Sequence, residues 1–196
     1  MIITNDIKKS ELENYSNKNN KISREIKNGE LIKIKNGLYE TDSNTPGYLL
    51  ASSIYGPSYL SSDFALYYYG LIPEKVSAYT SATFDKKKKK KYITFFGTYL
   101  YRDVPKEAYY LGVRLIKEGE YSYQIATPEK ALCDKLYTLA PVKNMERLEI
   151  LLFDDLRIDI DEFKKLNIQD IKEISELYHS TNVNLLYHYI RRFKNE

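Results

Sequence analysis

The segment Gln124–Tyr137 constrains the fold of this chain more than any other, because it reads as a strand that continues directly into a helix. Thr127 stands where a helix N-cap oxygen accepts a backbone hydrogen bond, and Pro128 follows at the first helical position, where its missing N–H costs nothing. The helix carries one apolar stripe, which consists of Ala131, Leu132, Leu136 and Leu139. We therefore expect the leucines of this helix to be buried against a sheet.

The segments on either side extend this unit into an α+β domain. Strands are predicted where Tyr, Ile, Val, Thr and Phe are concentrated, at Lys75–Thr83, Tyr92–Arg102, Gly112–Lys117 and Tyr121–Ala126. Helical periodicity predicts helices at Tyr48–Tyr55, Leu60–Tyr69, Met145–Leu156, Ile160–Leu166, Ile168–Tyr178 and Val183–Phe193. The expected architecture is a mostly antiparallel sheet that is flanked by helices.

The first part of the chain has a different pattern. A capping box that begins at Ser10 predicts a short helix to about Tyr15. A second helix is predicted over Asn17–Asn28, before a glycine that would end it. Asn36-Gly37 lies between two short strand-like runs and is the preferred two-residue hairpin turn. Helix, turn, helix and hairpin form a winged helix-turn-helix, in a reduced form because only nine residues precede Ser10.

The polar segment Thr41–Gly47 predicts a linker between two units. It divides the chain into a winged helix-turn-helix of residues 1–45 and an α+β domain of residues 46–196. A unit of about 45 residues buries too little apolar surface to be stable alone. We expect it to lean on the larger domain or on a second copy of itself.

The second predicted helix has one face suited to DNA. At about 100° per residue, Ile22 and Ile26 fall together and are expected to face the small core, with polar and basic residues opposite. In the hairpin strand that follows, isoleucines alternate with lysines, so that one face packs and the other meets phosphate. Residues 15–36 hold six Lys and Arg against two Glu, a net charge of +4. The predicted DNA-binding residues are Asn17, Asn20, Lys21, Arg24, Lys27, Lys33, Lys35 and Asn36.

No catalytic or metal-binding pattern is found in the sequence. Cys133 is the only cysteine and lies in the apolar stretch of a predicted helix, which favours a small core residue over a nucleophile. The two histidines, His179 and His188, are expected on different helices and lack metal-site spacing. We therefore expect no enzymatic activity, no bound metal and no cofactor.

The composition is that of a cytoplasmic protein. No apolar run reaches the length of about 18 residues that a membrane span needs, and the first residues lack the layout of a signal peptide. The net charge is only +3, which does not by itself indicate a nucleic-acid partner. The lysine run Lys86–Lys91 lies between two predicted strands, where we expect a solvated hairpin tip, although such a run also attracts RNA or an acidic protein surface.

Several motifs of the chain occur together in one order. They are Leu31–Tyr39, Ser58–Leu66, Tyr69–Pro73, Tyr79–Ser81, Ile125–Tyr137 and Leu151–Ile158. In order and spacing they resemble the AbiEi-type antitoxins of bacterial toxin–antitoxin systems, and Ile125–Tyr137 is the most similar part. The resemblance implies an antitoxin that is paired with a nucleotidyltransferase-like toxin. It also implies that the winged helix represses the shared promoter by binding operator DNA, and that the second domain carries antitoxicity without a stable complex.

Two other functions compete with this interpretation. One is a nucleotide- or RNA-processing enzyme built on the second domain, which a perturbed carboxylate cluster in a deep pocket would favour. The other is an interaction module whose winged helix binds no DNA. A basic face continuous across Arg24, Lys33 and Lys35 would favour the regulator.

Overall fold

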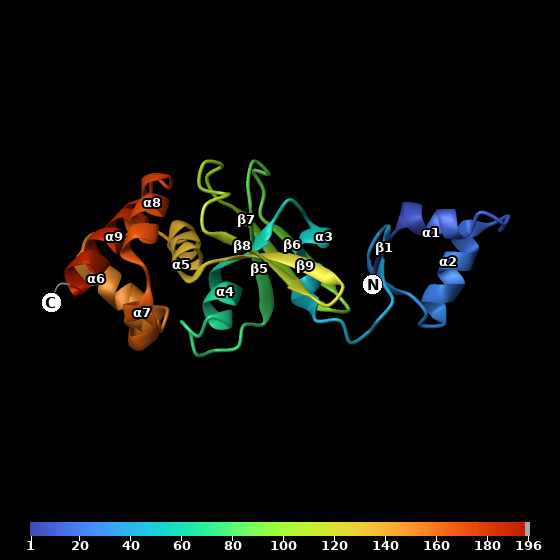
Figure 1. The fold of residues 1–196 in the computed structure, drawn as a ribbon, viewed down its shortest axis with the longest axis horizontal. Coiled ribbons are helices and arrows are strands. Elements are labelled where there is room, and N and C mark those ends of the chain that lie inside the picture. The colour runs from blue at the N-terminus through green and yellow to red at the C-terminus, as the bar shows by residue number, and fades with distance from the viewer. Residues whose placement is uncertain (195–196) are drawn as a thin grey trace.

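The computed structural model describes residues 1–194, and residues 195–196 of the predicted second domain lie outside the described residues. Three parts follow one another along the longest axis in Figure 1: an N-terminal unit, a sheet with its covering helices, and a group of C-terminal helices. The fold is α+β, as the sequence predicts.

The N-terminal unit combines two helices with a three-stranded antiparallel sheet. Its elements are β1 (Ile2–Thr4), α1 (Asn5–Glu11), α2 (Lys18–Lys27), β2 (Ile32–Lys35) and β3 (Leu38–Glu40), and the strand order is β1-β3-β2. The predicted second helix and the hairpin at Asn36-Gly37 are both confirmed. Gly29 ends α2 with φ +77°, a conformation that glycine adopts without strain.

The predicted start of the first helix is wrong. The capping box at Ser10 is not used, because α1 already begins at Asn5 and Ser10 lies inside it. Thr4 is the N-cap, and its hydroxyl accepts from the backbone N–H of Ile7. The reason is tertiary: Ile2–Thr4 pairs with β3, so the chain leaves that strand at Thr4 and turns directly into the helix.

The N-terminal unit packs against the larger unit of the same chain, which is one of the two arrangements expected for it. Its own core contains Ile3, Leu12, Ile22, Leu31 and Tyr39. Ile34 and Leu38, by contrast, are buried in the core of the second unit. Two polar contacts also join the units: Lys35 Nζ donates to the carbonyl oxygen of Ile54 at 2.5 Å, and the Tyr121 hydroxyl donates to Glu40 Oε2 at 3.0 Å.

The second unit is built on a six-stranded sheet in the order β6-β7-β5-β4-β9-β8. The strands are β4 (Tyr59–Leu60), β5 (Ala78–Thr83), β6 (Lys90–Thr94), β7 (Gly97–Asp103), β8 (Val113–Glu118) and β9 (Tyr121–Ala126). The linker leads into a 3-10 helix η1 (Gly47–Leu50) and the helix α3 (Ala51–Ile54), and α4 (Ser62–Tyr68) follows β4.

The sheet is mixed, with three antiparallel and two parallel strand pairs. The parallel pairs are β4 with β9 and β5 with β7. Two of the predicted elements need correction, one strand and one helix. Tyr92–Arg102 is not one strand but parts of β6 and β7, which form a hairpin that turns before Gly97. The predicted helix Leu60–Tyr69 begins only at Ser62, because Tyr59 and Leu60 form the short central strand β4.

Helices cover both faces of the sheet (Figure 1). On one face the hydroxyls of Tyr99 and Tyr101 donate to the carbonyl oxygens of Gly47 and Ala51, at 2.9 and 2.7 Å. The other face holds α4 and α5 (Pro128–Tyr137), which pack against each other. The remaining helices are α6 (Met145–Ile150), the π-helical turn η2 (Leu151–Asp155), α7 (Ile160–Lys165), α8 (Ile168–Glu176) and α9 (Thr181–Phe193).

The predicted boundary between strand and helix at Thr127 is confirmed. The Thr127 hydroxyl accepts from the backbone N–H of Lys130, and Pro128 opens α5. Leu132 and Leu136 are fully buried, as expected. Among residues 1–194, no helix is both long and apolar enough to cross a membrane.

Candidate nucleic-acid interface

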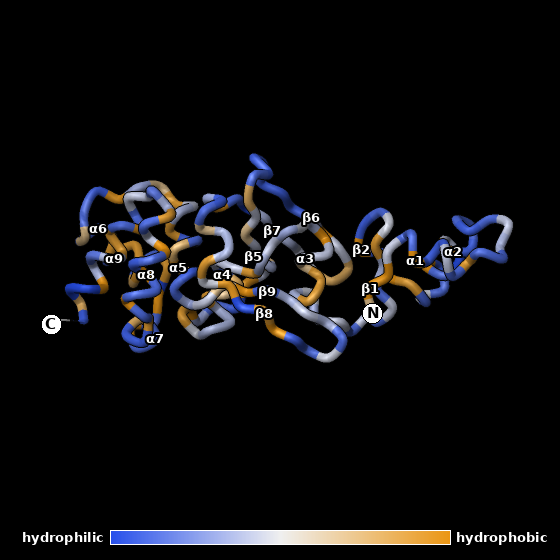
Figure 2. Tube along the Cα trace, turned by 45° about the horizontal axis from the view of Figure 1, so that its top comes forward, coloured by the Kyte–Doolittle hydropathy of each residue, from blue (hydrophilic) through white to orange (hydrophobic). Residues whose placement is uncertain are grey.

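The polar face of α2 lies on the outside of the N-terminal unit. Ile22 is 4% exposed and Ile26 packs beside it, so the residues opposite, Asn20, Arg24 and Lys27, point to solvent. Asn17 caps the helix, and its Oδ1 accepts from the backbone N–H of Asn20 at 3.0 Å. Figure 2 shows α1 and α2 at the end of the molecule opposite the C-terminus, so this face is open to a large partner.

Lys21 has a structural partner in the same unit. The carboxylate of Glu25 is buried, with Lys8 Nζ 2.9 Å from its Oε2 and Lys21 Nζ 3.5 Å from its Oε1. Burial alone would lower the pKa of Lys8, but hydrogen bonds and charge from Glu25 and Glu11 outweigh it and raise that pKa. Lys21 therefore helps to neutralise Glu25, and it is only half exposed at the edge of the polar face.

The hairpin contributes less than the alternation of its sequence predicts. Lys33 and Asn36 are exposed, but the side chain of Lys35 is directed into the contact with the carbonyl of Ile54. The pairing of β2 with β3 shifts register between Lys33 and Lys35, which breaks the alternation of inward and outward side chains. Lys35 therefore has a partner within the protein, and its predicted contact with a phosphate stays a prediction.

Most of the predicted DNA-binding residues are exposed in the structure. Asn20, Arg24 and Lys27 form one exposed row on α2, while Lys33 and Asn36 are exposed on the hairpin. Arginine, lysine and asparagine side chains on an open helix are suited to base edges and phosphates in a major groove.

A buried polar network lies under the segment Ile125–Tyr137, and sequence reasoning missed most of it. Lys130 is 0% exposed and Asp134 is 1% exposed, with Lys130 Nζ 3.2 Å from Asp134 Oδ1. Asp134 Oδ2 accepts from the hydroxyls of Tyr59 at 2.9 Å and Ser61 at 2.5 Å, and Oδ1 accepts from the hydroxyl of Tyr178. The spacing of Lys130 and Asp134 predicts the ion pair, but nothing local indicates the hydroxyl donors.

The network is isolated from solvent, and this burial changes the acidity of the groups in and beside it. Burial and the charge of Asp134 raise the pKa values of Tyr59 and Tyr178 well above the ordinary value. Cys133 beside them is fully buried, and burial raises the pKa of its thiol. A thiol in that state is a poor nucleophile. The prediction that Cys133 is a core residue is confirmed.

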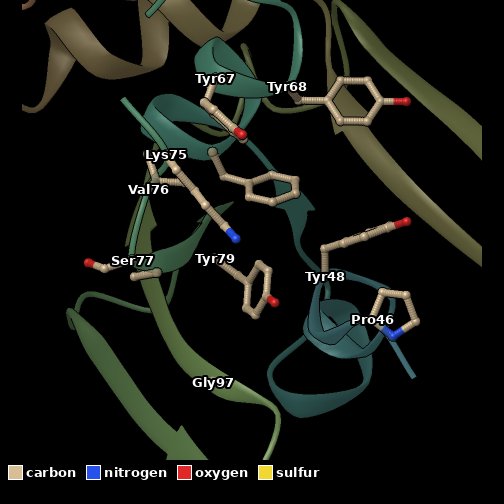
Figure 3. Close-up of a pocket in the computed structure, with 11 residues that line it drawn as sticks. Pro46, Tyr48, Tyr67, Tyr68, Lys75, Val76, Ser77, Tyr79 and Gly97 are labelled. Carbon is tan, nitrogen blue, oxygen red and sulfur yellow. The ribbon is translucent and has the colours of Figure 1, made fainter. Parts of the chain in front are cut away.

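A cavity of about 520 Å³ lies where α4 and η1 meet the start of β5. Five of its eleven lining residues are aromatic, among them Tyr48, Phe64 and Tyr79, and Figure 3 shows Lys75 extending toward Tyr79. Burial and a hydrogen bond to Glu118 raise the pKa of Tyr48 to about 12. No carboxylate is among the lining residues of this cavity.

In residues 1–194, no three His, Cys, Asp or Glu side chains are grouped so that they would hold a metal ion. Compared with known proteins, the chain matches no family model and no curated sequence.

Proposed function

We propose that the protein is a DNA-binding antitoxin that represses its own operon. The observation that carries the DNA-binding part is the exposed row of Asn20, Arg24 and Lys27 on α2. This row lies opposite a buried isoleucine face and is open to solvent at one end of the molecule. In this proposal the N-terminal unit acts as a reduced winged helix-turn-helix, α2 lies in the major groove, and the hairpin contacts the adjacent phosphates.

The distribution of charge supports this assignment. Residues 15–36 carry a net charge of +4 although the whole chain carries only +3, so the remainder is slightly negative. A localised basic surface attracts phosphate at long range, whereas the same charge spread evenly would not.

The antitoxin part of the proposal rests on the order of the motifs that resemble AbiEi-type antitoxins. The partner would be a nucleotidyltransferase-like toxin in the cytoplasm. Ile125–Tyr137, the most similar segment, forms the buried centre of the second unit, so we assign it to the scaffold of the antitoxin domain.

A mobility-shift titration against the promoter of its operon tests the DNA-binding role. Arg24→Ala and Lys33→Ala should each weaken binding and reduce the salt slope by about one per lost phosphate contact. Lys35→Ala is the matched control, because its ammonium contacts Ile54 and should leave the slope unchanged. A wild-type protein that shows no preference for promoter over random DNA refutes the repressor role.

Co-expression with the toxin gene from the same operon tests the antitoxin role separately. Arg24→Ala should still rescue growth while repression of a promoter reporter is lost, because the two activities are assigned to different units. Loss of rescue in a folded Arg24→Ala protein would place antitoxicity in the N-terminal unit and contradict the assignment.

A further inference from the structure

A second basic surface lies on the large sheet, far along the chain from α2. Residues 85–106 hold eight Lys and Arg against two Asp, a net charge of +6, so the rest of the chain carries a net charge of −3. Because β5 and β7 are parallel, the loops that follow them leave the sheet at the same end (Figure 1). The lysine run Lys86–Lys91 lies in the first of these loops and at the start of β6.

The position of the lysine loop is fixed by contacts at its base. Asp103, the last residue of β7, accepts from the hydroxyl of Thr83 and from the backbone N–H of Lys87, each at 2.6 Å. Lys86 Nζ lies 5.4 Å from the centre of the Tyr55 ring. The side chains of Lys88 and Lys89 are exposed, and within residues 1–194 they form no ion pair.

The loop borders a groove that runs between the sheet and the end of α5. A hollow of about 300 Å³ is lined by Lys87–Lys89, Arg102, Asp103, Tyr137 and Thr138. A second hollow of about 130 Å³ shares Arg102 and Thr138 with the first, and its lining includes Lys135, whose Nζ lies 2.6 Å from the carboxylate of Asp63 in the same hollow. The two hollows are therefore neighbours, with Arg102 between them.

Two features of this groove point to one kind of ligand. Arg102 is exposed and unpaired among the described residues, which leaves a guanidinium to bind phosphate. Tyr137 is 37% exposed, and its ring is held by an edge contact with Tyr178 at 5.4 Å, so a base has a fixed aromatic surface to stack on.

We propose that this groove binds single-stranded nucleic acid through its phosphates and one stacked base. A basic track with an aromatic platform is the arrangement that sequence-independent single-strand binders use. The larger hollow, of about 300 Å³, lies between the lysine loop and Tyr137, and we take this small space to favour a single strand over a duplex. The site is separate from the α2 face and does not depend on the proposed repressor role.

Fluorescence anisotropy with a labelled oligouridylate of about 12 nucleotides tests the groove. The triple variant Lys88→Gln, Lys89→Gln and Arg102→Gln should weaken binding about 10- to 100-fold at 100 mM salt and reduce the salt slope by about 2. The matched control removes the same charge from exposed lysines elsewhere, at Lys117, Lys143 and Lys172, and should bind like wild type.

A second pair of variants tests stacking. Tyr137→Ala should weaken binding of the oligouridylate between about 5-fold and 100-fold, while Tyr137→Phe keeps the ring and the affinity. Thermal melts identify a variant that fails to fold. If Tyr137→Ala does not fold, the triple charge variant and its control still test the proposed binding.

Several results would overturn the proposal. Equal loss of affinity in the groove variant and the charge-matched control would show that binding depends on the net charge of the protein and not on this groove. Tighter binding of random duplex DNA than of oligouridylate would show that the surface binds duplex and not single-stranded nucleic acid. Displacement of the oligouridylate by a polyglutamate peptide at equal charge would indicate a docking surface for an acidic protein. The groove variant should still shift promoter DNA, so failure of this proposal is distinguishable from failure of the repressor role.

Discussion

The ion pair of Lys130 and Asp134 should be the most sensitive polar feature of the core, and its two partners should not be equivalent. Asp134→Asn removes the only carboxylate that the structure places near the ammonium of Lys130, which is 0% exposed. Lys130 would keep contacts to the carbonyl of Ala108 at 2.8 Å and to the Tyr178 hydroxyl, but no opposite charge. Leaving one member of a buried pair uncompensated costs about 3–5 kcal/mol, which is the loss we expect.

Lys130→Met should cost less, because the carboxylate left behind keeps its other donors. The hydroxyls of Tyr59, Ser61 and Tyr178 all point at Asp134, and hydrogen bonds to a charged group contribute about 1.5–3 kcal/mol each. We therefore expect a loss below about 3 kcal/mol for Lys130→Met. The double variant Lys130→Met, Asp134→Asn removes both buried charges at once. Its loss should therefore be smaller than the sum of the two single losses, by a coupling energy of about 1–3 kcal/mol.

Urea denaturation followed by far-UV circular dichroism measures these values. Circular dichroism is the suitable signal because the chain has no tryptophan. The reasoning fails if Lys130→Met destabilises the protein more than Asp134→Asn does. It also fails if the two losses simply add, since independent sites show no coupling.

Two further predictions concern packing and pH. Leu136→Ala should lower the free energy of unfolding by about 2–5 kcal/mol through lost burial and the cavity left behind, whereas Cys133→Ala should cost far less and leave toxin rescue intact. Loss of rescue in folded Cys133→Ala protein would contradict the scaffold role. Burial would raise the pKa of Glu40, but hydrogen bonds from the Met1 amino group, the backbone and Tyr121 outweigh it, so its pKa lies below the ordinary value of 4.5. Its contribution to stability is therefore present above about pH 4.5 and lost as pH falls further, and Glu40→Gln should flatten that acid-side loss in urea titrations. Parallel pH curves for wild type and Glu40→Gln would refute this.

Local patterns in the sequence predicted the elements whose boundaries depend on neighbouring residues. Thr127-Pro128 predicted the start of α5, Asn36-Gly37 predicted the hairpin, and Gly29 predicted the end of α2. These predictions succeed because caps and tight turns are satisfied by hydrogen bonds within a few residues. The capping box at Ser10 failed for the converse reason, since the pairing of β1 with a strand more than 30 residues away set the start of α1.

The residues of the candidate site were likewise predictable where they depend on local pattern and unpredictable where they depend on distant contacts. Helical period alone placed Asn20, Arg24 and Lys27 opposite the isoleucines of α2, and the structure has them exposed. The fate of Lys35 was not predictable, because its partner is the backbone of Ile54 in another unit and the register shift in β2 has no signal in the sequence.

The sequence by itself determined the local elements, the apolar stripe of α5 and the polar face of α2, because these depend on helical and strand periods and on caps. Only the tertiary structure decided that β4 pairs in parallel with β9 and β5 with β7, since parallel pairing joins segments with no local contact. It alone buried Lys130 and Asp134 among hydroxyls from two distant segments, Tyr59–Ser61 and Tyr178, and made one groove from Arg102 and Tyr137. Such sites arise where side chains far apart in the chain meet, and the chemistry of each depends on neighbours that no local pattern names.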